Sequence, residues 1–507
     1  MRGRKVAVCV FTIVICSLMS AVQVCGAEET IVFLDDVKVI NQINDIYSQY
    51  IDYPHGYSIY FPSHMQVDTT LSAVRTVFWD GDRQIEIYYD NFQGAVHTAD
   101  SYIKYSSRFK QNSRDHLVEK DAEIRVKGMK AFLLVWRREK IAALENDKNY
   151  YVSVKIVKNR TEVYTIFIKS ASPITDYMTL VNSFSLVEKD GTARIQTTFQ
   201  NAEKNLNDET RKFFNTYFLE NTALKWGLFE RTTSSGLTFL HQLERELDYT
   251  FEFILRYQNF GGAFPAAEML GAYKDNKYVE LTLQANSDDP GITYDILRGA
   301  YDQYLNQYAL DIKEFSHPLL FRLNNEMNGD WCIYSSYYTS NDTDLYKAVW
   351  RYVYAIFQKN GVDNVLWVWN PHDLSFPGFR WNHYLTYYPG DEYVDIIGLT
   401  GYNTGNYFSG ERWRSFAEIY TGLYDEYSSV FKQPFMITEF ASNSFGGDKA
   451  AWIRNMFANI EKLPNIKAAI WWNGTDYDPD GNPGRIYRLD ETEETLAAFR
   501  QGLQKYN

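Results

Sequence analysis

The chain contains little cysteine. Its 507 residues include 4 cysteines, and three of them, Cys9, Cys16 and Cys25, lie close to the beginning. Only Cys332 remains in the rest of the chain, so no framework of intrachain disulfides is available there. Without disulfides the fold depends on its hydrophobic core, which is more typical of an exported bacterial protein than of a cysteine-rich eukaryotic one.

Histidine is also scarce, with 8 residues, and the sequence contains neither an HExxH motif nor cysteine pairs at metal-binding spacing. These absences argue against a catalytic metal, and we expect no cofactor. The run DYDPDGN begins like a calcium loop, with acidic residues alternating before a glycine: Asp476, Asp478, Asp480 and Gly481. Tyr487 stands where the closing acidic ligand belongs, so we interpret the run as a turn-rich loop and predict no metal site.

Positive charge is in deficit, because 51 Lys+Arg stand against 64 Asp+Glu and give a net charge of −13. A nucleic acid or an anionic membrane would bind against a repulsive field, whereas a neutral polymer would not. Aromatic residues, by contrast, make up 17% of the chain. Most of them are expected in the core, but aromatic faces also suit stacking against sugar rings. We therefore predict no nucleic-acid partner.

An apolar run stands at the beginning of the chain. MRGRK is followed by VAVCVFTIVICSLM and then by VCGAEET, which gives a basic start, a short apolar stretch and an exit of small residues. This pattern predicts a signal peptide at residues 1–27, cleaved after Ala27. An uncleaved membrane anchor is the alternative, although the run is short for a span. We predict a secreted or cell-surface bacterial protein that acts as a monomer.

Residues 28–190 show the short alternating runs of a small α+β domain. The runs include YSIYF, IEIYYDNF, AFLLVW, YYVSVKIV and VYTIFI, and a helix is expected near 99–109. The tryptophans of these runs, Trp79 and Trp136, either contact glycan or cell wall or pack in the core, and packing is the more usual role. The polar segment 191–219 reads as a linker that runs into a helix.

Residues 220–507 repeat a unit of one apolar strand and one amphipathic stretch. Eight strands can be counted: LKWGLFE, FEFILRYQ, YVELTLQ, PLLFRLN, VLWVWNP, VDIIGLTGY, FMITEF and IKAAIWWNG. Eight units in about 285 residues match a (β/α)8 barrel, whose functional residues lie at the carboxyl ends of the strands. We therefore predict an α/β fold, a (β/α)8 TIM barrel preceded by the smaller α+β domain.

Two glutamates stand at strand ends of this repeat. Glu326, in LLFRLNNEMNGDW, follows the fourth strand, and Glu439, in FMITEFAS, ends the seventh, so both carboxyl groups should face the same mouth of the barrel. An acid that protonates a leaving oxygen and a carboxylate that attacks a sugar carbon are the two groups that a retaining glycosidase needs. Either glutamate alone could be an ion-pair partner, but together they favour a glycosidase site.

Four segments in order make this half resemble glycoside hydrolase family 26: FRLNNEMNGDW, YYPGDEYVDIIGLTGYNTG, PFMITEFAS and AAIWWNG. The resemblance covers nearly all of residues 220–490, and the best-known activity of the family is endo-β-1,4-mannanase. It implies that Glu326 is the acid/base, with a raised pKa, and that Glu439 is the nucleophile. For retention of configuration the two carboxyl groups should lie about 5–5.5 Å apart.

The resemblance also implies that Tyr402, at the end of the sixth strand, hydrogen-bonds the nucleophile. It implies that Trp471 floors the subsite of the attacked sugar, while Trp472 points to the other face if pairing is regular. Core packing is the alternative for both Tyr402 and Trp471.

Further candidates come from position alone. Arg322 lies four residues before Glu326, on the inner face of the same strand, where a guanidinium either orients a carboxylate or makes a structural salt bridge. Trp331, in the loop after the fourth strand, and Trp226, on the first strand, are candidate sugar platforms, with packing as the alternative.

Two positions depart from the family pattern. Asn325 stands where family 26 mannanases usually have histidine, and most other members of the clan use this asparagine to hydrogen-bond the sugar 2-hydroxyl. Thr400 replaces an aspartate that often precedes the sixth-strand tyrosine by two residues. Both changes weaken the inference that the 2-hydroxyl is axial, as it is in mannose.

We therefore predict a secreted retaining endo-β-glycanase that hydrolyses a polysaccharide, with β-1,4-mannan as the expected substrate. Mixed-linkage β-1,3-1,4-glucan and β-xylan are the alternative substrates. Two alternatives belong to other classes: a glycan-binding protein on a disabled barrel, and a cell-surface scaffold in which the N-terminal domain is the active part.

Overall fold

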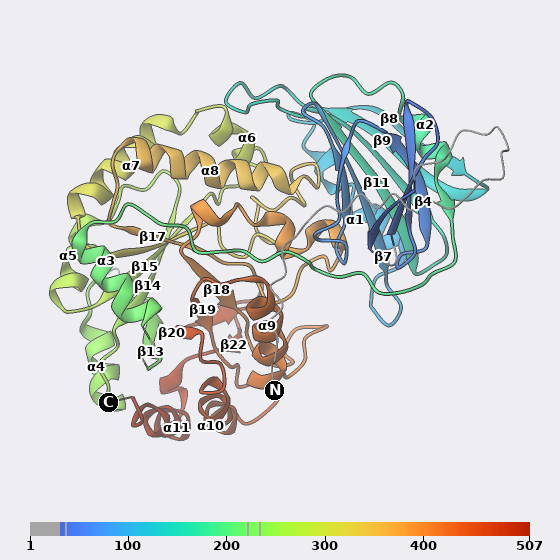
Figure 1. The fold of residues 1–507 in the computed structure, drawn as a ribbon. Coiled ribbons are helices and arrows are strands. Elements are labelled where there is room, and N and C mark those ends of the chain that lie inside the picture. Colours follow the sequence, from blue (N-terminus) through green and yellow to red (C-terminus); the bar gives the residue numbers. More distant parts are fainter. Residues whose placement is uncertain (1–30, 36–37, 221–222, 233–234, 507) are drawn as a thin grey trace, which may run out of the picture.

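The computed structural model describes residues 31–35, 38–220, 223–232 and 235–506, which form an N-terminal domain of β-sheets and a barrel domain (Figure 1). The predicted signal peptide, residues 1–27, lies outside the described residues. Among the helices of the described part, none combines the length and the apolar character needed to cross a membrane.

The N-terminal domain consists of two antiparallel sheets. Its strands are β1 (Ile31–Asp35), β2 (Lys38–Gln42), β3 (Tyr47–Asp52), β4 (Tyr57–Pro62), β5 (Gln66–Asp68), β6 (Thr76–Trp79), β7 (Arg83–Asn91), β8 (Leu117–Val126), β9 (Met129–Arg137), β10 (Tyr150–Val157), β11 (Glu162–Ser170) and β12 (Ser185–Leu186). One sheet has the order β1-β2-β3-β4-β12 and the other β5-β6-β7-β11-β10-β9-β8. Two short helices, α1 (Ala99–Tyr105) and α2 (Tyr177–Ser183), and a 3-10 turn (Arg108–Gln111) complete the domain.

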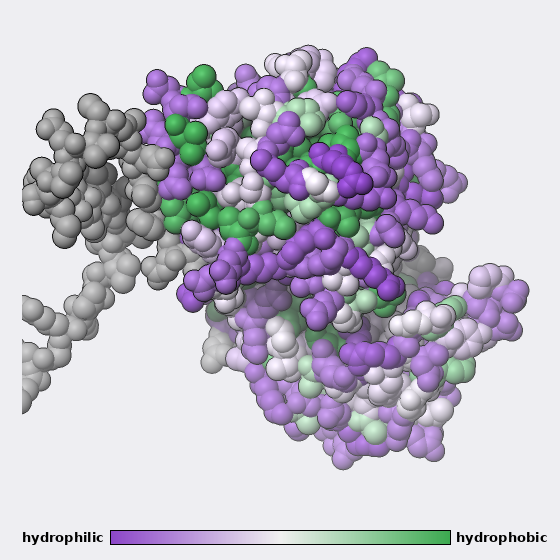
Figure 2. All heavy atoms as spheres, turned by 90° about the vertical axis from the view of Figure 1, so that its right-hand side faces the viewer, coloured by the Kyte–Doolittle hydropathy of each residue, from purple (hydrophilic) through white to green (hydrophobic). Residues whose placement is uncertain are grey.

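The core of this domain lies between the two sheets. Alternate residues of β10, such as Val152 and Val154, face this core together with Tyr57 and Phe61 of β4. The intervening residues of β10 therefore face the opposite side of the larger sheet. Figure 2 looks onto this domain and shows a mostly hydrophilic surface with scattered hydrophobic patches, and the barrel domain emerging below it.

The barrel domain is a closed barrel of eight parallel strands, and this confirms the predicted fold. The strands are β13 (Lys225–Glu230), β14 (Phe253–Asn259), β15 (Tyr278–Gln284), β16 (Leu319–Leu323), β17 (Val365–Trp369), β18 (Ile396–Thr400), β19 (Phe435–Phe440) and β20 (Ile466–Asn473). The surrounding helices are α4 (Thr238–Leu247), α5 (Ala266–Lys274), α6 (Ile292–Leu297), α7 (Asp302–Phe315), α8 (Thr343–Lys359), α9 (Phe416–Val430), α10 (Lys449–Ile460) and α11 (Glu493–Leu503).

Short 3-10 turns connect β17 to β18: Arg380–Asn382, Tyr384–Tyr387 and Asp391–Tyr393. After β20 the chain forms a hairpin of β21 (Thr475–Tyr477) and β22 (Pro483–Ile486), followed by a 3-10 turn at Leu489–Glu491. The segment between the domains runs along the outside of the barrel, where the backbone of Phe199 bonds to Val430 and Lys432 (Figure 1).

That segment ends in α3 (Asp208–Phe214) and a π-turn (Asn215–Leu219). Phe213 and Phe218 of these turns pack in one cluster with Phe253 and Ala468, which lie near the amino ends of β14 and β20. The helix therefore closes the amino-terminal end of the barrel and leaves the carboxyl-terminal end open to a site.

The barrel-facing side of the larger sheet packs against barrel loops. Trp136 is 1% exposed and packs in a cluster that joins sheet residues to Tyr337, Phe379 and Trp381 of the barrel domain. Its indole Nε1 donates to Ser340 Oγ at 3.0 Å. The possibility that Trp136 contacts glycan is therefore wrong, whereas Trp79 is 42% exposed.

Buried charges join the two domains as well. Lys169 of β11 lies 2.7 Å from Asp342 Oδ1, 2.9 Å from Glu86 Oε1, and against Asp344. Asp342 is the N-cap of α8, and Tyr151 donates to its second oxygen at 3.0 Å. These contacts tie the N-terminal domain to the end of the long loop between β16 and α8.

Candidate active site

The barrel interior changes from apolar to polar toward the carboxyl ends of the strands. The lower layers are apolar and include Leu255, Leu320, Val368, Ile396 and Ile470. The next layer is buried and polar, with Glu280, Arg322, Asn370 and Thr400 in mutual contact. Apolar layers below and charged groups above are the arrangement expected beneath the active site of a barrel enzyme.

A β-bulge directs Glu439 into the barrel. Along β18, Leu399 pairs with Ile437 and the next residue, Thr400, pairs with Glu439, so Thr438 is an extra residue in β19. Strict alternation would place Thr438 and Glu439 on opposite faces, but Thr438 Oγ1 contacts Thr400 Oγ1 at 2.8 Å and Glu439 also reaches the interior. Bulges often re-aim a side chain beside an active site.

Four donors surround the Glu439 carboxylate, which is 5% exposed. Arg322 Nη1 donates to Oε1 at 2.8 Å and Asn325 Nδ2 donates to Oε1 at 3.3 Å. The hydroxyls of Tyr402, at 2.9 Å, and of Tyr257 donate to Oε2. These bonds hold the carboxylate in one orientation, and the Arg322 and Tyr402 side chains lie where the sequence predicts them.

Tyr257, on β14, was not among the predicted site residues. Burial and the Glu439 charge raise the pKa of Tyr257 well above its usual range, so the hydroxyl keeps its proton and remains a donor. The only sequence signal is its place at the carboxyl end of the second strand, two residues after the inward-facing Leu255.

Glu326 follows β16 in a strained backbone conformation. Its φ is +52° and that of Asn324 is +50°, in the left-handed region that asparagine tolerates better than glutamate does. The Glu326 N–H donates to Asn370 O at 2.7 Å, and Asn324 Oδ1 accepts from Ala285 N at 2.7 Å. Neighbouring strands thus hold the turn, and such strain in a non-glycine residue is typical of functional sites.

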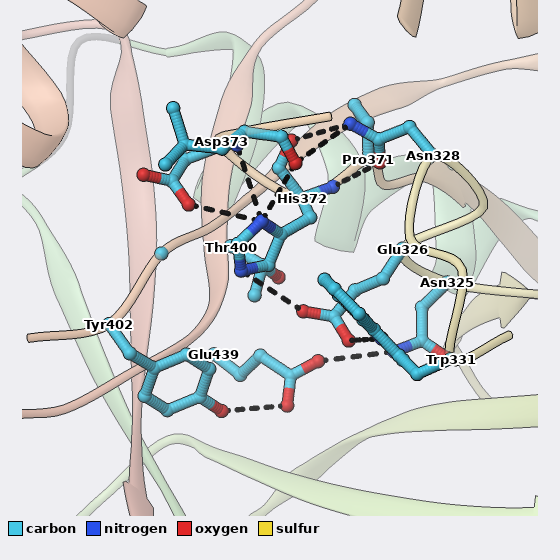
Figure 3. A network of polar contacts seen from close by, with 12 residues as sticks. Asn325, Glu326, Asn328, Trp331, Pro371, His372, Asp373, Thr400, Tyr402 and Glu439 are labelled. Carbon is cyan, nitrogen blue, oxygen red and sulfur yellow. Dashed lines mark hydrogen bonds and ion pairs between the residues drawn. The ribbon is translucent and has the colours of Figure 1, made fainter. Parts of the chain in front are cut away.

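The Glu326 carboxyl group is turned toward the same space as that of Glu439 (Figure 3). Trp331 Nε1 donates to its Oε2 at 3.2 Å, and His372 Nε2 lies 3.9 Å from its Oε1. Burial, together with the Glu439 charge, raises the pKa of Glu326 to about 7, although His372 and Trp331 act in the opposite direction. At neutral pH this carboxyl group therefore both holds and releases a proton readily.

Asn325 is 3% exposed and bridges the site. Besides its bond to Glu439, its Oδ1 accepts from Gln284 Nε2 at 2.8 Å. Its amide nitrogen is thus fixed beside the Glu439 carboxylate, as the prediction of a sugar 2-hydroxyl contact requires.

The tryptophans divide into two groups. Trp331 is 50% exposed and its ring packs beside His372 and Phe376, so it remains a candidate sugar platform. Trp226 and Trp471 are both 0% exposed, so the predictions that they bind sugar are wrong.

The physical reason is the alternation of the strands. Trp226 and Trp471 point outward from the barrel, and both pack against Phe440 and Phe499. Trp472, the next residue on β20, points inward instead, stacks on Phe229 with ring centroids 5.1 Å apart and lies beside Tyr402. Trp472, rather than Trp471, is therefore the strand-eight tryptophan that lies beside Tyr402.

The acidic run after β20 forms the β21–β22 hairpin. Asp476 pairs with Arg485 at 3.0 Å, and Asp478 accepts from the Tyr407 hydroxyl at 2.7 Å and from the Asn482 backbone at 2.8 Å. Across the described residues, no group of three or more His, Cys, Asp or Glu side chains is set to hold a metal ion.

The closed barrel brings together two carboxyl groups in different environments, which is the arrangement that a retaining glycosidase requires. A family model described as glycosyl hydrolase family 26 matches residues 260–444. Endoglucanase H of Acetivibrio thermocellus is 32% identical over 291 residues, which cover 56% of this chain and 31% of that protein. A mannan endo-1,4-beta-mannosidase of Bacillus subtilis is 33% identical over 181 residues, which cover 34% of this chain and 44% of that protein. The barrel domain is thus similar to glycoside hydrolase family 26 over residues 260–444.

The chain spans less than half the length of these curated relatives. Among solved structures, the Bacillus subtilis mannanase man26 has a TM-score of 0.41 and 18% identity, covering 55% of this chain and 89% of that chain. A modular endo-beta-1,4-mannanase from Cellulomonas fimi has a TM-score of 0.46 and 18% identity, covering 60% of this chain and 76% of that chain. The fold assignment rests on the closed barrel itself rather than on these similarities.

Proposed function

We propose that this protein is an exported endo-β-glycanase that cleaves a neutral polysaccharide with retention of configuration. The observation that carries the proposal is the contrast between its two glutamates. Glu439 is held by four donors, one of them the Arg322 guanidinium, while the pKa of Glu326 is raised to about 7. A fixed carboxylate and a nearby acid of near-neutral pKa match the two roles that the reaction requires.

In the first step, a Glu439 oxygen attacks the anomeric carbon of the sugar while Glu326 transfers its proton to the leaving glycosidic oxygen. The carbon–oxygen bond breaks, the leaving chain departs with the proton, and a glycosyl ester to Glu439 remains. The Trp331 indole bond and the nearby His372 ring keep the Glu326 carboxyl group in place for this transfer.

In the second step, the Glu326 carboxylate accepts a proton from a water molecule. The oxygen of that water attacks the anomeric carbon from the face that the leaving group vacated. The ester bond breaks, Glu439 regains its negative charge, and the sugar leaves with its original configuration. A pKa of about 7 suits Glu326 to both directions of proton transfer.

For the substrate, we propose β-1,4-mannan first. β-1,4-linked glucan, including mixed-linkage glucan, is the second candidate, because the similarity to a protein named endoglucanase spans 291 residues and because Asn325 replaces the mannanase histidine. Thr400 is 0% exposed and bonds to Asn370 beneath the site, so it removes a charge from the floor without contacting the sugar itself.

Export and action as a monomer complete the proposal. The basic and apolar start of the sequence supports export. The substrate is the only partner that the site itself requires, since all its polar groups come from one barrel.

The test is release of reducing ends by residues 28–507 from β-mannan, mixed-linkage β-glucan, β-xylan and carboxymethyl cellulose in parallel. Rapid release from mannan, with NMR detection of retained anomeric configuration in the first product, is the expected result. Release from glucan alone would replace the substrate and keep the mechanism. Inverted products, or binding of a polymer without any products, would overturn the proposal of a retaining hydrolase.

Replacing Arg322 with methionine is expected to lower both stability and turnover. Burial raises the pKa of Glu280 to about 8 even though Arg322 opposes the shift, and Glu280 and Glu439 would both lose their buried cationic partner. The free energy of unfolding should fall by about 3–5 kcal/mol. Turnover should fall by about 10²-fold, because Glu439 loses a fixed donor.

Urea denaturation and the reducing-end assay measure these two effects. Arg256→Met is the matched control, since Arg256 pairs with Glu268 at 3.0 Å in a partly exposed position. That variant should lose less than about 1 kcal/mol. Equal effects of the two substitutions would show that Arg322 has no special part in the site.

A further inference from the structure

A second pocket lies away from the barrel mouth, in the N-terminal domain. It has a volume of about 550 Å³, within the usual range of ligand pockets, and lies between the α1 region and the barrel-facing side of the larger sheet. Tyr105 and Arg108 line it from the helical side, Phe132 and Lys155 from the sheet, and Tyr337 from the barrel domain.

Lys155 is the unusual residue in this pocket. It is 3% exposed, and its Nζ donates to Ser153 Oγ at 3.2 Å. The ammonium group has three donors, and no ion pair joins it to a described residue within 4.0 Å. Burial lowers the pKa of Lys155 to about 8, with the nearby Lys110 charge as a further cause. The lysine is thus held in the pocket wall without an acidic partner.

Lys169 provides an internal comparison. It lies on the neighbouring strand β11, is buried to a similar degree, and contacts the carboxylates of Glu86, Asp342 and Asp344. Where this domain buries a lysine for structural reasons, it therefore surrounds the ammonium with acids. Around Lys155 the nearby carboxylate is Asp121, which raises the pKa of the lysine only partly because Asp121 is itself paired with Lys110. Lys155 therefore keeps donors that an anion from outside the chain can bind.

The rest of the pocket carries the same sign of charge. Lys104, Arg108 and Lys110 line it together with Lys155, and the described lining contains a single carboxylate, Asp121. Asp121 pairs with Lys110 at 2.5 Å, which leaves the other cations free to face a ligand. Such an excess of cations in a chain of net charge −13 is a local feature that favours an anion.

The apolar part of the lining indicates what carries the anion. The rings of Tyr105 and Tyr337 lie 6.1 Å apart with their planes tilted by 43°, and Phe132 adds a further apolar wall. Aromatic rings suit the apolar face of a sugar ring, whereas an arginine fork and lysines suit a carboxylate or a phosphate. We propose that this pocket binds a sugar residue that bears an anionic substituent, either a carboxylate or a phosphate.

The site is separate from the hydrolytic reaction, because none of the residues that contact Glu326 or Glu439 lines it. Tyr337 nevertheless belongs to the loop between β16 and α8, which also carries Trp331. An anionic sugar bound here would therefore attach the protein to a charged wall polymer or to a charged branch of its substrate, next to the loop that leads into the cleft.

The test is ligand-observed NMR titration of the full chain, residues 28–507, with glucuronate, glucose 6-phosphate, glucose and inorganic phosphate. Wild type should bind glucuronate or glucose 6-phosphate with a Kd of about 1 mM, and the better of the two identifies the source of the anion. Lys155→Met and Arg108→Gln should each weaken that binding by about tenfold or more. Lys158→Met is the matched control, because Lys158 pairs with Glu162 at 3.1 Å, does not line the pocket and should change nothing.

Thermal unfolding separates binding from a structural role. Lys155→Met should leave the melting temperature unchanged or higher, since methionine is apolar and an uncompensated buried amine is removed. The anionic sugar should raise the melting temperature of wild type but not of this variant.

Three results would overturn the proposal. The first is the absence of saturable binding of either anionic sugar below about 10 mM. The second is binding that neither pocket variant weakens. The third is equal affinity for inorganic phosphate and glucose 6-phosphate, which would remove the sugar from the recognition. None of these results depends on whether the barrel hydrolyses a polysaccharide.

Discussion

In the Glu439→Gln variant, turnover of polysaccharide is expected to fall by at least about 10³-fold while the protein remains folded. An amide is a poor nucleophile toward an anomeric carbon, so no glycosyl ester forms. Glutamine keeps the shape of the side chain, and its oxygen can still accept from Arg322 and Asn325. The two tyrosine hydroxyls can rotate to accept from the new amide N–H.

Initial rates of reducing-end release at saturating substrate measure this loss, and thermal unfolding checks the fold. Glu494→Gln is the matched control, because Glu494 is exposed on α11, far along the chain from the strand ends. It should behave as wild type in both measurements. Turnover by Glu439→Gln within tenfold of the control would remove Glu439 from the reaction and with it the proposed mechanism.

The Glu326→Ala variant is expected to lose activity on substrates with poor leaving groups but not in the first step with good ones. Polysaccharide hydrolysis should fall by about 10²–10⁴-fold, because an unassisted sugar hydroxyl leaves poorly without a proton from a general acid. An aryl glycoside with an acidic phenol needs no such proton, so the first step should remain fast. The second step still lacks its base, and the result should be a burst of phenol equal to the enzyme concentration, followed by slow turnover.

The pH dependence of kcat/KM in the wild-type protein tests the same role of Glu326 as the general acid. The raised pKa of Glu326, about 7, favours the protonated carboxyl group, and the first step requires that proton. The value of kcat/KM for polysaccharide should therefore be high below about pH 7 and fall as the pH rises through that value. With the aryl glycoside, the burst rate of Glu326→Ala should lose this alkaline decline. A decline that persists in the variant would assign it to another group.

The sequence identifies the barrel and its two glutamates well, because both rest on repeated local patterns. Each strand is a short apolar run followed by an amphipathic helix, and strand ends locate Glu326 and Glu439 without any tertiary information. The small N-terminal domain is predictable for the same reason, since its alternating runs each form a strand.

Which face of a strand a tryptophan occupies is harder to predict. Trp226 and Trp471 lie against helices on the outside of the barrel, and Trp472 lies inside, yet outer and inner faces are both rich in apolar residues here. The bulge at Thr438 is equally hard to predict, because no residue in FMITEF indicates an extra position in the strand. Tyr257 belongs to no motif and becomes visible only when β14 and β19 are brought together across the barrel.

The contacts between the domains depend on residues distant in sequence, such as Lys169 with Asp342 and Trp136 with Ser340. These pairs have no local signature, and the polar segment 191–219 is typical only of a linker that runs into a helix. In the structure that segment lies along the barrel, and its terminal helix closes the lower end.

Buried contacts fix the N-terminal domain to the barrel domain, and they affect how the protein can bind a polymer. They include the Lys169–Asp342 ion pair and the aromatic cluster around Trp136. Many polysaccharide-degrading enzymes carry auxiliary modules on flexible tethers, which search the surface at random around the catalytic body. Here the N-terminal domain is fixed to the loop that carries Glu326, so its orientation relative to the barrel mouth is set by the fold. A polymer bound by that domain would therefore reach the barrel in one fixed orientation and at one fixed distance.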